Sequence, residues 1–439
     1  MAKIMILGLL FACQLSCANS APQAVQGAPV GLSAEAPASL SGTAQRLYEQ
    51  ARPRLLQVRI VLKDRETQAS TGSGFIVSPT GLVVTNYHVI SQLALEPEKY
   101  RVEYNGPDGR KGGLVLLALD VRHDLAVLAI DKAAANEPYF GWGDAEPIQG
   151  QRLYSLGNPL DIGFAVVEGT FNGYPQRGFY PQMLFTGAIN PGMSGGPVLN
   201  AAGQVVGINV ARHLGGELVS FLVPARFARE LVRSASSGRP LKLPANGEIA
   251  RQLLEHQQDL VARTLSKAFR HQTHGKYRVP LLDETYARCW GDANSPKRKG
   301  MGVERSDCVM DTSLFTGQGN TGALGVRHEV YDGSRLGTWR FYRQYSNSFG
   351  DESFEPGGTN MTAAECHEDF VDQHGLPLRV VACARAYRKF PGLYDLSVLV
   401  ASLDDPLHGV QGRLDASGVS FDNGLKLIKH YVEGFAWAR

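Results

Sequence analysis

The sequence predicts a mainly β region over residues 54–225, a sandwich or a pair of barrels, followed by a smaller α+β domain. Two observations predict the β region: short apolar strands recur along it, and turns containing glycine or proline separate them. The third observation is a change of pattern after residue 248, where apolar residues fall at helical spacing. A chain of 439 residues is also too long to form one hydrophobic core.

The first twenty residues have the order of a secretory signal peptide. Lys3 gives a positive start, residues 4–12 form an apolar run too short to span a bilayer, and small residues follow as far as Ser20. We therefore expect a signal peptide over 1–20 and export to the periplasm or the medium. Residues 10–13 loosely resemble a bacterial lipoprotein cleavage box, so a lipid anchor at Cys13 is the alternative.

Residues 21–43 are rich in Ala, Pro, Gly and Ser, a composition that predicts a flexible tether. The first folded domain is expected over 44–235, with a short helix at 44–50 and another at 224–234. Its predicted strands cover residues 55–61, 74–77, 82–86, 114–119, 125–130, 152–156, 204–209 and 221–223.

The Gly- and Pro-containing stretch 236–247 predicts a linker, and 248–439 an accessory domain of unknown role. Apolar residues at helical spacing predict a helix over 249–269, whereas 339–345 alternates like an amphipathic strand. His271 and His274 are spaced to share a helix face, but no third ligand accompanies them, so no metal site is predicted.

Four of the six cysteines lie in the last third of the chain. In an exported protein this even set predicts two disulfides, and we expect neighbours to pair: Cys289 with Cys308, and Cys366 with Cys383. A zinc site is the rival interpretation, although no CxxC pair is present.

The charge balance excludes some classes of partner. The 44 basic and 42 acidic side chains leave a net charge of +2, too little to attract nucleic acid. We predict no nucleic-acid partner, no stable membrane insertion, and no metal or organic cofactor.

Three segments contain residue types used in nucleophilic catalysis. A strand at 74–77 turns back into a second strand that is predicted to end at His88. Asp124 directly precedes the apolar strand 125–130, and Ser194 stands in the glycine-rich turn of 190–199. A serine hydroxyl becomes a nucleophile when an imidazole takes its proton, and a carboxylate orients that imidazole.

Glycines around the serine fit the same chemistry. Gly192 permits a backbone geometry that aims its own amide and that of Ser194 at one point, as a developing oxyanion requires. Gly195 and Gly196 are expected to let a substrate backbone come close.

Two further acids compete with Asp124 as the orienting carboxylate. Asp131 ends the same apolar strand, and Asp120 is also explained as the cap of a turn. His123, beside Asp124, is expected to be a solvated loop residue.

Together the three segments resemble the trypsin-like serine proteases of the bacterial HtrA (Deg) type over residues 54–230. The likeness also includes LGNP at 156–159 and FLVP at 221–224. It implies a double six-stranded β-barrel with the site between the barrels, and an endopeptidase acting on proteins or peptides. Carried onto this sequence, it makes His88 the general base, Asp124 its orienting acid, Ser194 the nucleophile, and Gly192 and Ser194 the oxyanion donors.

Two features depart from the pattern of such proteases. Met193 stands where digestive relatives have an acid that pairs with a freed N-terminus, and nothing after Gly247 is recognisable as a PDZ domain. Two alternatives therefore stay open: a non-catalytic, chaperone-like binding module on a protease scaffold, and a protease held latent by its C-terminal domain. Docking of a partner through that domain is also open.

The position six residues before the serine is expected at the base of the substrate pocket. It is Ala188, which offers no charge partner to Lys or Arg. With Asn209 and Phe221 as further expected pocket residues, we predict cleavage after small or medium aliphatic residues.

Overall fold

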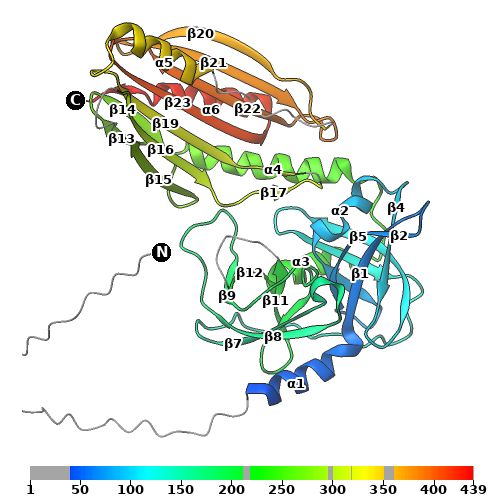
Figure 1. Ribbon diagram of the computed structural model, residues 1–439. Helices are drawn as coiled ribbons and strands as arrows, with labels where there is room; N and C mark the ends of the chain where they lie inside the picture. The colour runs from blue at the N-terminus through cyan, green and yellow to red at the C-terminus, as the bar shows by residue number, and fades with distance from the viewer. Residues whose placement is uncertain (1–39, 211–217, 295–299, 318, 351–359, 439) are drawn as a thin grey trace, which may run out of the picture. The chain divides into compact units, whose positions relative to one another are not determined.

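The computed structural model describes residues 40–210, 218–294, 300–317, 319–350 and 360–438 (Figure 1). The predicted signal peptide, Cys13 and most of the predicted tether lie outside the described residues. The first helix, α1 (Leu40–Ala51), begins earlier than the expected helix at 44–50. From Ser41 onwards the chain forms one compact unit.

Six antiparallel strands close the first barrel in the order β1-β2-β3-β6-β5-β4. β1 pairs with both β2 and β4, which completes the ring. The strands are β1 (Leu55–Leu62), β2 (Thr67–Ile76), β3 (Leu82–Thr85), β4 (Tyr100–Asn105), β5 (Lys111–Asp120) and β6 (Leu125–Ile130). Each strand predicted between residues 55 and 130 overlaps one of these, but β2 begins at Thr67, well before the predicted 74–77, and β4 was not predicted.

A second closed barrel follows, in the order β10-β11-β12-β9-β8-β7. Its strands are β7 (Arg152–Gly157), β8 (Ala165–Phe171), β9 (Met183–Thr186), β10 (Pro197–Leu199), β11 (Val205–Val210) and β12 (Val219–Pro224). The short helix η2 (Pro159–Asp161) follows β7, and α3 (Ala225–Ser234) follows β12, close to the predicted helix at 224–234. The double six-stranded barrel implied by the resemblance is therefore confirmed.

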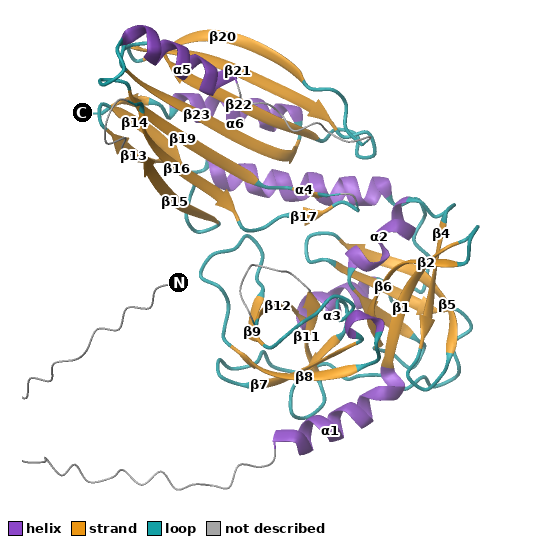
Figure 2. Cartoon of the chain, in the orientation of Figure 1, coloured by secondary structure: helices purple, strands orange, loops and turns teal. Residues whose placement is uncertain are grey.

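One prediction in the first barrel was wrong: the strand through His88 ends at Thr85, and His88 lies in helix α2 (Tyr87–Leu95) (Figure 2). Most side chains of this helix are buried, including Tyr87, Val89 and Ile90. A short apolar run that is buried on nearly all sides carries no periodicity that separates a strand from a helix.

The predicted linker, 236–247, is held against the first barrel. Leu241 N donates to Leu116 O at 2.9 Å, and Ala245 N donates to Ala94 O at 2.7 Å. The long helix α4 (Asn246–Leu265) follows, and its residue Ile249 is fully buried in the core of the first barrel. Further along, Leu260 is buried in the core of the C-terminal sheet. The helix therefore belongs to both cores.

The C-terminal region is built on a seven-stranded antiparallel sheet of order β15-β16-β19-β23-β22-β21-β20. Its strands are β15 (Ala287–Asn294), β16 (Gly302–Met310), β19 (Leu324–Asp332), β20 (Glu365–Gln373), β21 (Leu376–Ala386), β22 (Tyr394–Ser402) and β23 (His408–Val419). A three-stranded sheet contains β13 (Arg270–His274), β14 (Tyr277–Leu281) and β24 (Ala436–Trp437). Strands β17 (Leu314–Phe315) and β18 (Asn320–Thr321) form a separate two-stranded hairpin. The expected mixture of α and β structure is thus observed.

Helices α5 (Thr338–Gly350) and α6 (Phe421–Glu433) cover opposite faces of this sheet. Leu427 of α6 is buried with Val398 and Val400 of β22. Phe341 of α5 is buried with the intervening Leu399. Since neighbouring residues of a strand point to opposite faces, the two helices lie on the two sides.

Two predictions in this region chose the wrong element. The stretch 339–345, expected as a strand, is helical in α5: Phe341, Tyr345 and Phe349 recur every fourth residue and are buried, while Trp339 is 88% exposed. The seven residues 339–345 fit both the two-residue period of a strand and the period of a helix. Only Phe349, one helical turn further on, distinguishes the helix from the strand. His271 and His274, whose spacing would let them share a helix face, both lie in strand β13.

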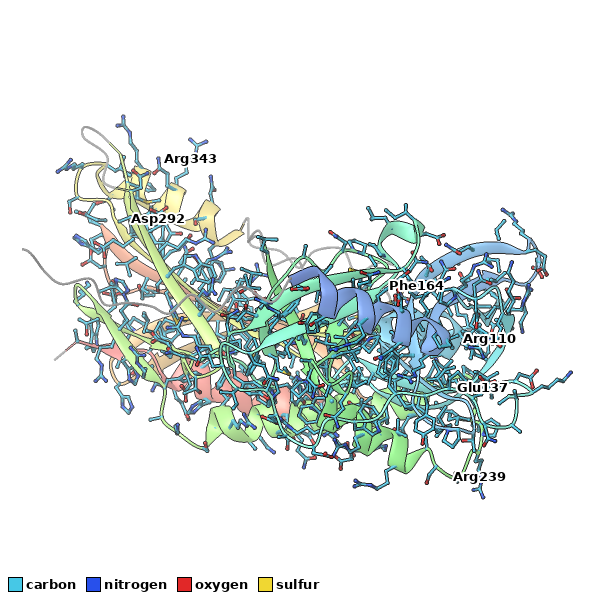
Figure 3. All side chains as sticks on the ribbon, turned by 90° about the horizontal axis from the view of Figure 1, so that it is seen from below. Arg110, Glu137, Phe164, Arg239, Asp292 and Arg343 are labelled. Carbon is cyan, nitrogen blue, oxygen red and sulfur yellow. A yellow bond between two sulfur atoms is a disulfide. The ribbon has the colours of Figure 1, made fainter. Side chains whose placement is uncertain are left out.

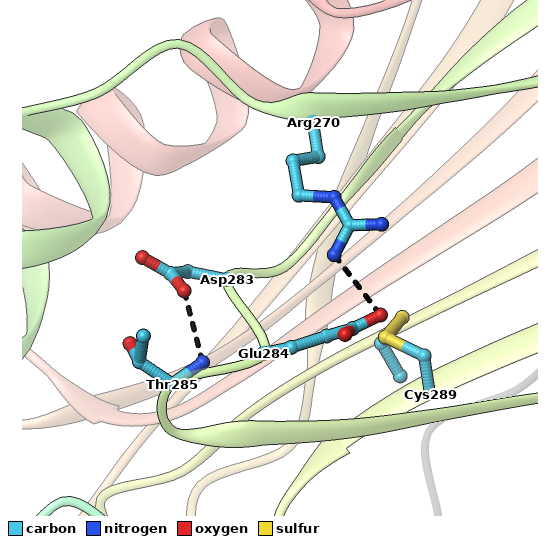
Figure 4. Close-up of a disulfide and its surroundings, with 6 residues drawn as sticks. Arg270, Asp283, Glu284, Thr285 and Cys289 are labelled. Atoms are coloured by element: carbon cyan, nitrogen blue, oxygen red, sulfur yellow. Dashed lines mark hydrogen bonds and ion pairs between the residues drawn. A yellow bond between two sulfur atoms is a disulfide. The ribbon is translucent and has the colours of Figure 1, made fainter. Parts of the chain in front are cut away.

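Both disulfides join neighbouring strands of the large sheet. Cys289 of β15 bonds to its cross-strand partner Cys308 of β16, and Cys366 of β20 to Cys383 of β21. The bonded pairs are those predicted. Figure 4 shows the surroundings of Cys289, where Glu284 forms an ion pair with Arg270 at 3.1 Å.

Polar contacts fix the outer surface of the barrels. Arg110 pairs at 2.7 Å with Glu137, whose side chain is almost fully buried (Figure 3). Tyr48 of α1 donates to the carbonyl of Phe164 at 3.1 Å, which anchors that helix to the second barrel. Over the described ranges, no helix is long and apolar enough to cross a membrane.

Candidate active site

His88 lies in the first turn of α2, and Asp124 organises that turn. The Asp124 carbonyl accepts bonds from Tyr87 N at 3.2 Å and from Asn86 Nδ2 at 2.7 Å. Its carboxylate Oδ1 accepts from His88 N at 2.8 Å. The first N–H groups of a helix have no partner within it, so Asp124 supplies acceptors that the helix itself lacks.

The same aspartate holds the imidazole. Asp124 Oδ2 lies 2.6 Å from His88 Nδ1. A carboxylate only accepts hydrogen bonds, so Nδ1 carries the proton, and in the neutral ring Nε2 keeps its lone pair. The two oxygens of Asp124 thus fix both the backbone and the ring of His88, and the ring is arranged to accept a proton.

Asp124 reaches this position through its backbone. It occupies the turn between β5 and β6 with φ of +56°, in the left-handed region that Asp tolerates better than most residues. Of the three candidate acids, Asp124 is the one for which the structure gives a contact with His88, whereas Asp131 N bonds to Gly113 O at the far end of β6.

Asp120 has a different partner. Its Oδ1 accepts from the backbone N–H groups of Arg122 and His123, and its Oδ2 lies 2.7 Å from His123 Nδ1. Burial raises the pKa of Asp120, but the bonds and the charge of His123 outweigh burial and leave the pKa below its usual value. The turn-cap interpretation of Asp120 is confirmed. The expectation of a solvated His123 was wrong, because its ring also stacks on Phe227 with centroids 3.7 Å apart.

The turn around Ser194 has its carbonyls directed inward. Pro191 O accepts from Leu160 N at 2.8 Å, and Met193 O accepts from Gly196 N at 3.0 Å and Asn209 Nδ2 at 3.2 Å. In a trans peptide the N–H points opposite to the carbonyl. The N–H groups of Gly192 and Ser194 therefore point away from these partners. That both point at one oxyanion stays a prediction.

Glycine is required in this turn for steric reasons. Gly192 has φ of +93°, and a Cβ there would lie 2.3 Å from Asn158 O. Gly195 has φ of +82°, and its Cβ would lie 2.3 Å from Ser73 O and 2.8 Å from Asn86 N. At Gly195 the close neighbours are thus the protein's own atoms, Ser73 O in β2 and Asn86 N just after β3. The approach of a substrate backbone to this glycine stays a prediction.

Ser73 of β2 links the serine turn to the first barrel, a role that the sequence did not indicate. Its N–H donates to Ser194 O at 2.8 Å, and its hydroxyl donates to Gly192 O at 2.7 Å while accepting from Asn158 N at 2.9 Å. The side chain is fully buried. Its partners are 85 and 119 residues away in sequence, so no local pattern could have revealed them.

Ser194 itself is 4% exposed, and its turn adjoins the segment that leads to His88. Gly195 packs against Asn86, and a Cβ at Gly72 would lie 2.5 Å from Val89 Cγ2 and 3.1 Å from Ser194 O. These contacts place the serine turn beside the N-terminal end of α2.

The expected pocket residues are found in different surroundings. Ala188 is half-buried after β9. Asn209 is fully buried, and its amide bonds to Ser155 Oγ at 2.7 Å and to Leu156 O at 2.9 Å, so its side chain supports the serine turn. Phe221, 8% exposed, lines a cavity of about 770 Å³. A substrate-binding role of these three stays a prediction.

Comparison with known proteins gives a match over the barrels. The family model of the trypsin-like peptidase domain matches residues 72–208. A probable periplasmic serine endoprotease DegP-like of Chlamydia pneumoniae is 32% identical over 179 residues, covering 39% of this chain and 35% of that protein. Proteins of the same description from Halomonas elongata and a Marinomonas species are 32% identical over 212 residues and 36% identical over 178 residues.

These likenesses concern only a part of each protein. The match to the Halomonas protein covers 46% of this chain and 41% of that protein. The match to the Marinomonas protein covers 39% of this chain and 36% of that protein. Among solved structures, a serine endoprotease from Yersinia pestis aligns with 45% of this chain and 68% of its own at 27% identity and a TM-score of 0.39. That structural score is too low to carry an argument. The likeness to trypsin-like peptidases depends on the two closed barrels and on the sequence matches. The chain therefore contains a domain that matches the trypsin-like peptidase family over residues 72–208 and is similar there to the DegP-like periplasmic endoproteases.

Proposed function

We propose that this chain is an exported serine endopeptidase that hydrolyses peptide bonds of proteins or peptides. In this proposal His88 is the general base, Asp124 orients it, Ser194 is the nucleophile, and the amides of Gly192 and Ser194 receive the oxyanion. The observation that carries the proposal is the double bonding of Asp124 to the backbone and the ring of His88.

The chemistry follows the acyl-enzyme route. His88 Nε2 takes the proton of Ser194 Oγ as the oxygen attacks the scissile carbonyl carbon, and Asp124 stabilises the imidazolium that forms. The tetrahedral oxyanion is held by the two amides, and collapse of the intermediate passes the proton from His88 to the leaving amine. Water then repeats the sequence on the acyl-enzyme and releases Ser194. None of these steps calls for a metal or an organic cofactor.

The direct test is covalent labelling of the full chain with a fluorophosphonate probe. We expect the wild type to be labelled, Ser194→Ala to be unlabelled, and His88→Ala to be labelled far more slowly. Ser237→Ala, a change in the exposed segment after α3, is the control and is expected to label like the wild type. An unlabelled wild type would overturn the proposal and favour the binding scaffold.

Latency is a separate outcome of the same assay. A chain that accepts the small probe at Ser194 but cleaves no peptide would have a competent serine and a closed cleft. A panel of peptides with Ala, Val, Leu, Lys or Arg before the scissile bond also tests the predicted aliphatic preference, since Ala188 offers no charge partner to Lys or Arg.

Export is proposed from the N-terminal sequence, the two disulfides and the relatives, whose names describe periplasmic proteins. The mass of the mature protein purified from cells distinguishes the two routes. Cleavage after Ser20 leaves an unmodified N-terminus, whereas lipoprotein processing leaves a diacylated Cys13.

A further inference from the structure

A segment of the C-terminal region lies against the helix that carries His88. Residues 311–317 and 319–321, between β16 and β19, lie outside the seven-stranded sheet and contain the β17–β18 hairpin. Phe315 in this hairpin meets the His88 ring edge-on, with centroids 6.4 Å apart, and the Tyr87 ring at 6.5 Å. Leu314 is 2% exposed within the core of the first barrel.

The tip of the hairpin is seated directly on α2. Gly317 has φ of +89°, and a Cβ there would lie 2.3 Å from Leu95 Cδ1, so a larger residue would strain the turn and displace the Leu95 side chain. Thr316 closes the turn by bonding through both its N–H and its hydroxyl to Gly319 O, at 2.8 and 2.9 Å.

A second contact fixes the same helix from the C-terminal region. Lys389 pairs with Glu96, the C-cap residue of α2, at 2.8 Å. Lys389, and after it Lys99, hold the pKa of Glu96 below its usual value. Phe390 and Leu393 are buried in the core of the first barrel. The C-terminal region is thus held against α2 and the first barrel at a second place, outside the hairpin.

The hairpin does not fill the space beside the catalytic pair. A cavity of about 440 Å³ lies between them, and its lining includes His88, Asp124 and Val121 from the barrel and Leu314 and Phe315 from the hairpin. This volume is within the range of pockets that bind small ligands. If the hairpin blocked the site, its side chains would occupy this space. The cavity indicates instead that the hairpin borders the site and leaves it open.

We propose that the described residues of this segment, 311–317 and 319–321, form one wall of the substrate cleft and that Phe315 determines which side chain fits beside His88. This inference rests on the proposed function, because a peptide with its scissile carbonyl at Ser194 must pass His88. The side chain next to the scissile bond then enters the cavity. The lining of that cavity combines apolar residues such as Phe315 and Val210 with charged residues, Arg122 and Asp311 among them. The part of the peptide side chain that meets Phe315 is therefore expected to be apolar.

The test changes the size of the wall residue in both directions and profiles cleavage of a peptide library. Phe315→Ala enlarges the cavity and is expected to raise cleavage of peptides with Phe or Trp beside the scissile bond about tenfold relative to those with Ala or Val. Phe315→Trp is expected to shift selectivity toward small residues. A merely structural residue would lower all rates together and would not shift selectivity in opposite directions.

Phe390→Leu is the matched control, because Phe390 packs in the same core without lining the cavity. It is expected to keep the wild-type selectivity. Phe315 is only partly buried, so its substitutions are compatible with folding, which the thermal unfolding midpoint checks. Phe315→Leu is the milder replacement if Phe315→Ala unfolds.

Unchanged selectivity in both Phe315 variants would overturn the inference. An equal rise of all peptide rates, together with faster probe labelling, would also overturn it, because it would show that Phe315 blocks the site instead of selecting side chains. Binding of the same peptides to Ser194→Ala chains carrying the Phe315 changes separates this inference from the proposed function. That measurement reports the fit of the cleft without any turnover.

Discussion

At the scale of single residues, Ser73 supports the oxyanion donors. Its hydroxyl holds Gly192 O at 2.7 Å and Asn158 N at 2.9 Å, and its N–H holds Ser194 O at 2.8 Å. Without the hydroxyl, two buried backbone groups lose a partner, and the peptide that carries the Gly192 amide loses one of its restraints. Ser73 is therefore a positioning residue, since it acts through the backbone of the serine turn.

We predict that Ser73→Ala lowers kcat about ten- to a hundredfold, somewhat less than the loss of an oxyanion donor itself, with little change in KM. The measurement is kcat and KM on one peptide, together with the affinity of a peptide boronic acid, whose tetrahedral adduct uses the oxyanion site. Ser70→Ala, on the same strand and nearer the solvent, is the control. Equal losses in both variants would contradict a specific role of Ser73.

A second prediction at this scale separates the two acids. Asp124→Asn retains an acceptor for His88 N but presents an amide N–H to Nδ1, which favours the wrong tautomer, so kcat is expected to fall about 10⁴-fold. Asp120→Asn removes the partner of His123 and is expected to change kcat by less than about tenfold. Steady-state rates of the two purified variants check this, and a larger loss for Asp120→Asn would reverse the assignment.

The sequence predicted the candidate catalytic residues because each stands in a short segment of recognisable composition. It did not predict the role of Ser73 or the hydrogen bond from Leu160 N to Pro191 O, because these bonds join distant segments and involve backbone atoms that any residue possesses. It also misplaced His123, whose stacking on Phe227 joins two elements about a hundred residues apart in the printed sequence.

At the scale of elements, helix α4 supports the turn that carries Asp124. Gln252 of α4, 5% exposed, accepts from Val121 N at 2.7 Å and donates to Leu119 O at 2.9 Å. The helix thus pairs backbone groups where β5 ends. A helix predicted only from its apolar spacing reveals its core face, but not that one of its polar residues bonds to another element.

We predict that Gln252→Leu lowers the free energy of unfolding by about 2–4 kcal/mol, because two buried backbone groups lose their partners. Urea unfolding of the full chain measures the change. Gln258→Leu is the matched control: the same substitution at an exposed position of the same helix is expected to stay within about 0.5 kcal/mol of the wild type. Similar losses in both variants would show that leucine, rather than the lost bonds, is responsible.

At the scale of the whole molecule, the predicted two-domain organisation understates how closely the chain is integrated. The core of the first barrel includes Leu253 of α4, Leu314 of the hairpin and Phe390 from the loop after β21. Composition indicated a linker at 236–247, but it could not indicate that Leu241 and Ala245 bond to the barrel. Contacts of this kind depend on the tertiary structure and leave no local periodicity.

Acid stability is a property of the whole molecule that one buried histidine is expected to influence. His328 of β19 is 1% exposed; burial lowers its pKa to about 3, with the charge of His274 acting in the same direction and that of Asp307 opposing it. Nε2 lies 3.0 Å from Tyr431 Oη, and Nδ1 has no hydrogen-bond partner within the described part of the chain. Protonation in the folded state would leave a buried charge without compensation.

The sign of the effect follows from proton binding. An unfolded histidine binds a proton below its ordinary pKa of about 6.5, whereas folded His328 stays neutral down to a pH of about 3. Its contribution to stability is therefore fully present above pH 6.5 and is lost as the pH falls, by about 1.4 kcal/mol per unit. At pH 5 this single group is expected to cost the fold about 2 kcal/mol.

Urea unfolding of the full chain at pH 7 and pH 5 measures this loss. We expect His328→Gln, which keeps a polar group near Tyr431 but cannot titrate, to remove about 2 kcal/mol of the difference between the two pH values. His367→Gln, at an exposed position of β20, is expected to leave the difference unchanged. The variant's lower stability at pH 7 does not affect the test, because the comparison uses the slope with pH. An unchanged slope in His328→Gln would mean that other groups cause the acid sensitivity.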